Sequence, residues 1–134
     1  MQLHEFLGQV QDRARLSSLD DALRATRATL ETLGERLEGG QPGNLGAQLP
    51  EELKTLLANP QLSASERFSS DEFFQRVSAR EHEDLPAAVF HARAVVDVLT
   101  DAVAPGVMEK VRGQLPEDYQ RLFEAGSEGR MGGA

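Results

Sequence analysis

Two arginines are the residues of this chain whose type and spacing best suit ligand chemistry. Arg27 and Arg93 are each followed, four positions later, by an acidic residue, Glu31 and Asp97. This spacing places each pair on one face of a helix. A guanidinium at the border of an apolar stripe is either a structural anchor for its acidic neighbours and nearby loop carbonyls, or a site for an anion or a partner's carboxylate.

The histidines offer a second possibility, a metal site. His82 lies among charged residues in the segment 80–84, and His91 follows on an expected helix. Neither takes part in a His-Glu-x-x-His or Glu-x-x-His pattern, and the chain has no cysteine and no Gly-x-Ser-x-Gly motif. The sequence therefore predicts no catalytic residue, no cofactor and no metal ion, and a protein that is not an enzyme.

Phe90 is the apolar residue that fits its helix least well. At about 100° per residue it lies roughly 140° from the apolar stripe, between Arg93, Asp97 and Asp101. Either this helix is central and contacts structure on both sides, or Phe90 belongs to a protein-binding or homodimer patch.

Helices are the elements that must position these residues. Apolar residues recur at steps of three and four over residues 2–15, 19–38 and 86–104, which predicts three amphipathic helices. Ser18 and Ser70 are expected N-caps. Pro50 and Pro116 are each expected to open a shorter helix, and further short helices are expected over 44–48 and 107–114.

The second half of the chain repeats the first. At an offset of 66, residues 22–58 align with 88–124 without a gap, with ten identities in 37 positions. The first helices match at an offset of 67, through Phe6/Phe73 and Val10/Val77. A four-residue segment occurs in both copies, and we interpret it as a structural joint of the repeat; it comprises Gln48, Leu49, Pro50 and Glu51, and then Gln114, Leu115, Pro116 and Glu117.

The predicted fold is an all-α helical bundle built from two tandem repeats of about four helices each. Repeat one spans 2–58 and repeat two spans 70–124, joined by a linker at 59–69 that is rich in Pro and Ser. Because a single copy would bury too little surface, the repeats should share one core and form a single domain, 1–124. Residues 125–134 are Gly-rich and are expected to form a disordered tail.

An ordered set of residues carries a resemblance to a known family. The set comprises Phe6 and Val10, Ala25 to Leu37 with Arg27, Gln48-Leu49-Pro50, Asp71-Glu72-Phe73 with Arg76-Val77, Ala92-Arg93-Ala94-Val95, Gln114-Leu115-Pro116 and Leu122-Phe123. With this set, residues 2–124 resemble the prokaryotic domain of unknown function 2267 family. The resemblance implies a small all-helical protein with a tandem repeat, and it implies no activity or catalytic residue.

Charge and composition limit the kinds of partner that the protein can have. The formal net charge is −8, which disfavours nucleic acid and anionic membrane surfaces as partners. No apolar run approaches the roughly 20 residues that span a bilayer, and the first residues do not read as a signal peptide, so a cytoplasmic protein is expected.

Three functions remain open at this stage. The first is a non-enzymatic interaction protein, possibly homo-oligomeric, that uses the helix face around Phe90. The second is a small-ligand or anion-binding module that uses Arg27 and Arg93 between the repeats. The third is a metal-dependent protein around His82 and His91.

Overall fold

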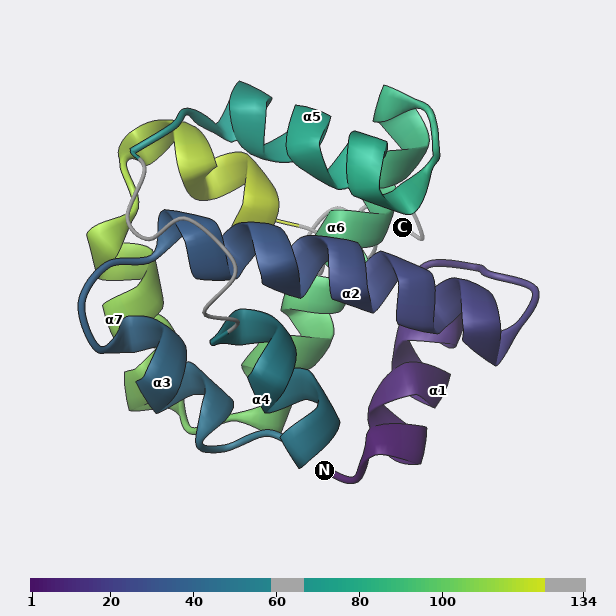
Figure 1. The fold of residues 1–134 in the computed structure, drawn as a ribbon, viewed down its shortest axis with the longest axis horizontal. Coiled ribbons are helices and arrows are strands. Elements are labelled where there is room, and N and C mark those ends of the chain that lie inside the picture. Colours follow the sequence, from purple (N-terminus) through teal and green to yellow (C-terminus); the bar gives the residue numbers. More distant parts are fainter. Residues whose placement is uncertain (59–66, 125–134) are drawn as a thin grey trace.

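The structure, a computed structural model, describes residues 1–58 and 67–124, and all the regular elements in these residues are helices (Figure 1). The predicted all-α bundle is therefore confirmed. In chain order the elements are α1 Leu3–Arg13, α2 Leu19–Arg36, α3 Gln41–Gly46, α4 Glu51–Leu57, α5 Ser70–Glu81, α6 Leu85–Ala102, α7 Pro105–Gln114 and the 3-10 helix η1 Glu117–Phe123.

The long helices begin next to capping side chains, and each ends two residues earlier than the sequence predicts. Ser18 caps α2 by accepting a hydrogen bond from the Asp21 N–H, and Asp84 caps α6 in the same way from Ala87. Gly39 follows α2 with a φ of +61°, a conformation in which glycine is favoured.

Three predicted details are wrong. Ser69, not Ser70, caps α5, because the Ser69 hydroxyl accepts from the Glu72 N–H. Pro50 and Pro116 each precede a helix as its N-cap rather than opening it as the first helical residue. The last element is a 3-10 helix, a tighter turn than the α-helix that the spacing suggested.

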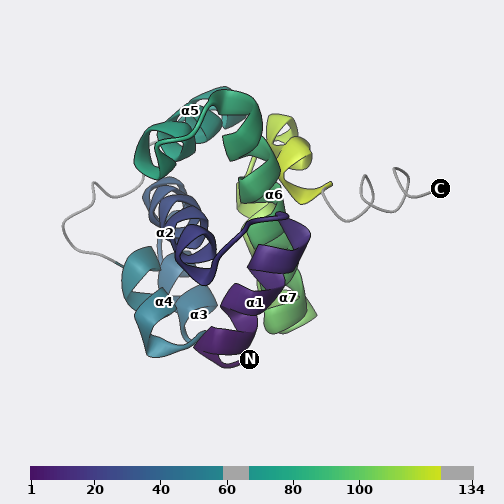
Figure 2. The ribbon, with the colours of Figure 1, turned by 90° about the vertical axis from the view of Figure 1, so that its right-hand side faces the viewer.

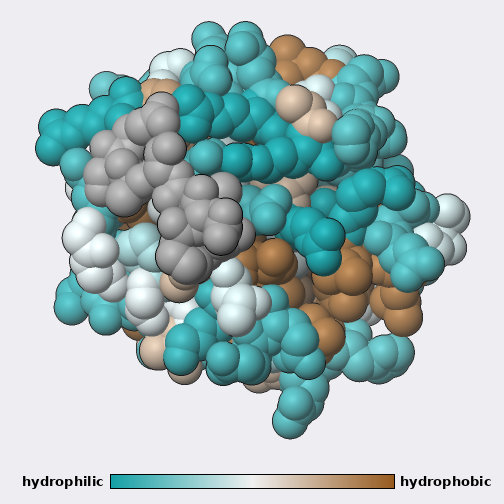
Figure 3. All heavy atoms as spheres, in the orientation of Figure 1, coloured by the Kyte–Doolittle hydropathy of each residue, from teal (hydrophilic) through white to brown (hydrophobic). Residues whose placement is uncertain are grey.

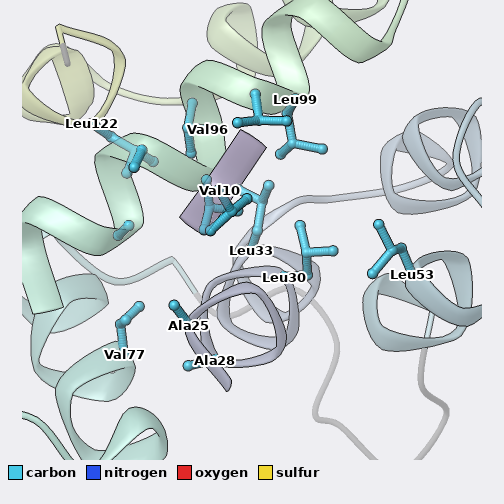
Figure 4. Close-up of a cluster of buried hydrophobic side chains, with 14 of the residues drawn as sticks. Val10, Ala25, Ala28, Leu30, Leu33, Leu53, Val77, Val96, Leu99 and Leu122 are labelled. Atoms are coloured by element: carbon cyan, nitrogen blue, oxygen red, sulfur yellow. The ribbon is translucent and has the colours of Figure 1, made fainter. Parts of the chain in front are cut away.

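The two long helices form the centre of the molecule. Both α1 and α5 pack against α2 and also against α6, while α4 covers α2 and η1 covers α6 (Figures 1 and 2). One core runs through both predicted repeats, and in Figure 4 side chains from six elements meet there. These are Val10, Ala25, Ala28, Leu30, Leu33, Leu53, Val77, Val96, Leu99 and Leu122, each at most 2% exposed.

The order of elements in the first half, α1 to α4, recurs in the second half as α5, α6, α7 and η1. Moreover, the first helix of each half, α1 or α5, packs against the long helix of its own half and also against that of the other half. This shared arrangement supports the tandem-repeat interpretation, which stays a prediction. The predicted linker falls mostly on 59–66 and the predicted tail on 125–134, and both segments lie outside the described residues.

The outer surface is mostly hydrophilic on the face drawn in Figure 3, with apolar side chains gathered below α2, between α4 and α1. None of the helices in residues 1–58 and 67–124 has the length and apolar character needed to cross a bilayer.

Candidate functional site

The exposed strip of α6 carries Phe90 and the charged residues that follow it. Phe90 is 47% exposed, the highest value among the large apolar side chains that the structure describes. One helical turn further on, Arg93 donates from Nε to the carbonyl of Arg121 in η1, at 2.6 Å. Helix α6 does contact elements of both halves, as one interpretation of Phe90 proposed, but the Phe90 ring itself faces solvent.

Asp97 on the same strip is engaged by a residue that sequence spacing did not indicate. Arg13 of α1 donates to Asp97 at 2.8 Å and to Asp101 at 2.7 Å, and also to Gln9 at 2.6 Å. These charges favour the cationic form of Arg13, whose pKa is raised even though burial opposes the rise. The expected helical pair between Arg93 and Asp97 is therefore replaced by a pair between two helices.

The two predicted arginines differ in their surroundings. Arg27 is exposed on α2, whereas Arg93 is half-buried beside η1. The second Gln-Leu-Pro-Glu segment borders two grooves on the surface. Neither Arg27 nor Arg93 lines these grooves. An anion site shared by Arg27 and Arg93 stays a prediction.

The glutamines of the Gln-Leu-Pro-Glu segments link the two halves reciprocally. Gln48 Oε1 accepts from the Ala104 N–H at 2.7 Å, just after α6 ends. Gln114 Oε1 accepts from the Glu38 N–H at 3.0 Å, just after α2 ends, and its amide donates back to the Glu38 carbonyl at 3.1 Å. Because Glu38 and Ala104 also correspond at the offset of 66, each segment closes the long helix of the other half.

Two ion pairs also link the halves reciprocally. Arg13 corresponds to Arg80 at the offset of 67, and Asp101 corresponds to Glu35 at the offset of 66. As Arg13 binds Asp101, so Arg80 binds Glu35 at 2.7 Å. Burial would raise the pKa of Glu35, but the hydrogen bonds and charges of Arg80 and Arg76 outweigh it and lower the pKa.

The remaining residues of the two segments differ in burial. Leu49 is 9% exposed and belongs to the core, whereas Leu115 is only partly buried. Pro116 and Glu117 are exposed and, with Leu115, border an open groove of about 470 Å³ between α7 and η1. Pro50 and Glu51 sit at the start of α4, which packs on both α2 and α3.

The structure gives His91 a partner that the spacing did not reveal. His91 Nδ1 lies 2.5 Å from Oε2 of Glu81, which is 1% exposed. This hydrogen bond raises the pKa of His91; burial opposes it, while the charges of Glu81, Glu83 and Asp21 add to it. The pair ties the end of α5 to the start of α6.

Within the described residues, the structure does not bring His82 and His91 together into a metal site. His82 is exposed at the C-terminal end of α5, in the left-handed conformation with a φ of 60°. Across residues 1–58 and 67–124, no group of three or more His, Asp and Glu side chains is placed to hold a metal ion.

A cluster of arginine and aromatic side chains lies between the end of α2, the start of α5 and η1. Arg36 donates from Nε to the Phe68 carbonyl at 2.8 Å, and its guanidinium carbon is 5.1 Å from the ring centre of Tyr119. The Tyr119 hydroxyl contacts the carbonyls of Phe68 and Ser69 at 2.7 and 3.1 Å. Burial raises the pKa of Tyr119 to about 12, although the Arg36 charge opposes the rise.

Comparison with known families gives one match. The family described as uncharacterized conserved protein (DUF2267) matches residues 3–122, almost the whole described chain. The chain belongs to the DUF2267 family. The chain matches no curated protein. Membership in DUF2267 thus confirms the resemblance of the ordered residue set, and the function has to be argued from the surfaces of this DUF2267 protein.

Proposed function

We propose that this DUF2267 protein is a non-enzymatic, cytoplasmic interaction protein that docks a protein partner on the face of α6 around Phe90. The observation that carries the proposal is the 47% exposure of Phe90, an aromatic side chain on a helix whose other sides are covered by α1, α2, α5 and η1. Exposed aromatic side chains are a common source of binding energy at protein interfaces.

The neighbouring contacts support a rigid docking surface. Beyond Phe90, the bonds from Arg93 to η1 and from Arg13 to Asp97 and Asp101 hold the strip to the elements on either side. A preorganised surface loses less entropy on binding than a flexible one. The net charge of −8 further supports a protein partner over nucleic acid.

The first test is self-association, because a second copy of the chain is one partner that this surface could accept. Sedimentation velocity over a wide concentration range should show wild-type dimers that Phe90→Ser abolishes. Leu19→Ser is the matched control, since Leu19 is also exposed, at 36%, but lies at the start of α2.

A second test covers a partner other than the chain itself. A photo-crosslinking amino acid at position 90 should give a discrete adduct in host cells, while the same amino acid at the exposed position 27 should not. A wild-type monomer at every concentration, together with no adduct specific to position 90, would refute the proposal.

A further inference from the structure

A second groove, of about 620 Å³, lies where the two halves meet on the other side of the Leu115–Pro116 corner. The end of α2, the residues before α5 and the second Gln-Leu-Pro-Glu segment border this open groove. Its volume is in the range of sites that hold small ligands. The lining includes Arg36, Glu38, Arg67, Ser69, Gln114 and Asp118.

Arg36 is the unusual member of this lining, because it is a buried cation without a carboxylate. Its relative exposure is 4%, yet its contacts are the Phe68 carbonyl and the rings of Tyr119 and Phe68. It forms no ion pair with any residue in 1–58 or 67–124. Fully buried charges in proteins are normally paired with an opposite charge.

Three carboxylates near Arg36 accept hydrogen bonds from other groups. Glu38 accepts from Arg67 at 3.0 Å, and Glu35 accepts from Arg80 at 2.7 Å. Asp118 accepts from the Ser70 N–H at 2.7 Å. Among the described residues, none of these three carboxylates forms an ion pair with Arg36, although Glu38 and Asp118 also line the groove.

The internal repeat provides a comparison within the same chain. At the offset of 66, Arg36 corresponds to Ala102 and Tyr119 corresponds to Leu53. The first half thus uses a fully buried leucine where the second half uses a tyrosine that stacks on a cation. The equivalent positions of the repeat are therefore apolar, and a charged side chain is not a requirement of the repeat at the position of Arg36.

We infer that this groove binds an oxyanion, a carboxylate or a phosphate group of a small ligand, with Arg36 as its anchor. A guanidinium presents a planar fork of N–H donors that matches both kinds of oxyanion. The Ser69 hydroxyl accepts from the Glu72 N–H and keeps its own proton to donate at the groove. The site is distinct from the Phe90 face and uses neither Arg27 nor Arg93.

Tyr119 makes the site directly observable. It is the only tyrosine and the chain has no tryptophan, so intrinsic fluorescence reports a ring that lies against Arg36. Wild-type protein is titrated with inorganic phosphate and, separately, with citrate, at constant ionic strength set by chloride. We expect a saturable change in Tyr119 fluorescence, and the arm that saturates identifies phosphate or carboxylate as the ligand group.

Two variants of Arg36 and one matched control decide the assignment. Arg36→Met should raise the Kd by about tenfold or more, the loss expected for a charge-assisted hydrogen bond. Arg36→Lys keeps the positive charge and therefore preserves folding more readily. It removes the guanidinium's fork of N–H donors, so it should also weaken binding. Arg27→Met removes an equal charge from an exposed site on the same helix and should leave the Kd unchanged, as should Phe90→Ser.

The inference fails if neither anion saturates, if the Arg36 variants bind as wild type does, or if Arg27→Met weakens binding equally. Should both Arg36 variants unfold, the wild-type amide NMR spectrum still decides. Phosphate or citrate must then shift the signals of Arg36, Ser69 and Tyr119, and shifts centred elsewhere would overturn the assignment.

Discussion

The packing of α4 on α2 depends on the absence of a side chain at Gly34. A β-carbon built at this position would lie 2.2 Å from the carbonyl oxygen of Leu57, the last residue of α4. Gly34→Ala therefore forces the end of α4 to move by about 1 Å before ordinary contact is restored. That movement also displaces Leu53 and Leu57, which are 0% and 2% exposed in the core.

The expected cost follows from two opposing effects. Overpacking of a core contact costs about 1–3 kcal/mol, and the upper part of that range applies because a backbone carbonyl cannot rotate away. Alanine recovers about 1 kcal/mol through its higher helix propensity. We therefore expect Gly34→Ala to lower the free energy of unfolding by about 2 kcal/mol, which lowers the melting temperature by about 8 °C.

Urea denaturation followed by circular dichroism measures this change, with Gly8→Ala as the matched control. Gly8 is also helical, in α1, but a β-carbon there meets no atom within 4 Å. Gly8→Ala should be neutral or stabilise the fold by up to about 1 kcal/mol. If Gly34→Ala were as stable as Gly8→Ala, the close approach of α2 and α4 would be wrong.

Two further predictions concern the contacts that join elements. Because the pKa of His91 is raised above its ordinary value of 6.5, the bond to Glu81 contributes fully below pH 6.5 and is lost as the pH rises through the raised value. Urea unfolding across this range should show stability declining with pH in wild type and declining less in His91→Gln; equal slopes would contradict this. Gln114→Ala removes two partly buried bonds and should cost about 1–2 kcal/mol, whereas Gln48→Ala removes one exposed bond and should cost less than about 1 kcal/mol. The reverse order in chemical denaturation would contradict the reciprocal contacts.

Most of the fold was predictable because its signals are local. Apolar spacing and caps such as Ser18 act within a few residues, so they place α2 and α6 without knowledge of the rest of the chain. The misassigned cap at Ser70 shows the limit of this reasoning: Ser69 and Ser70 are both suitable caps, and Asp118, from η1, binds the Ser70 N–H.

The candidate sites were less predictable, because their partners come from distant parts of the chain. Arg93 and Asp97 have helical spacing, yet each is bound by another element, Arg93 by η1 and Asp97 by Arg13 of α1. Arg36 has no distinctive sequence neighbours. The anion site inferred for it rests on its burial and on the ion pairs that Glu35 and Glu38 form with other arginines.

The sequence by itself determined the helices and their order, since hydrophobic period and capping are properties of short segments. The tertiary structure alone decided that α1 and α5 each pack on both long helices, that Glu81 meets His91, and that the Arg36 guanidinium is buried without an ion pair to any residue in 1–58 or 67–124. Each of these depends on which surfaces exclude water together, and that is a property of the packed chain as a whole.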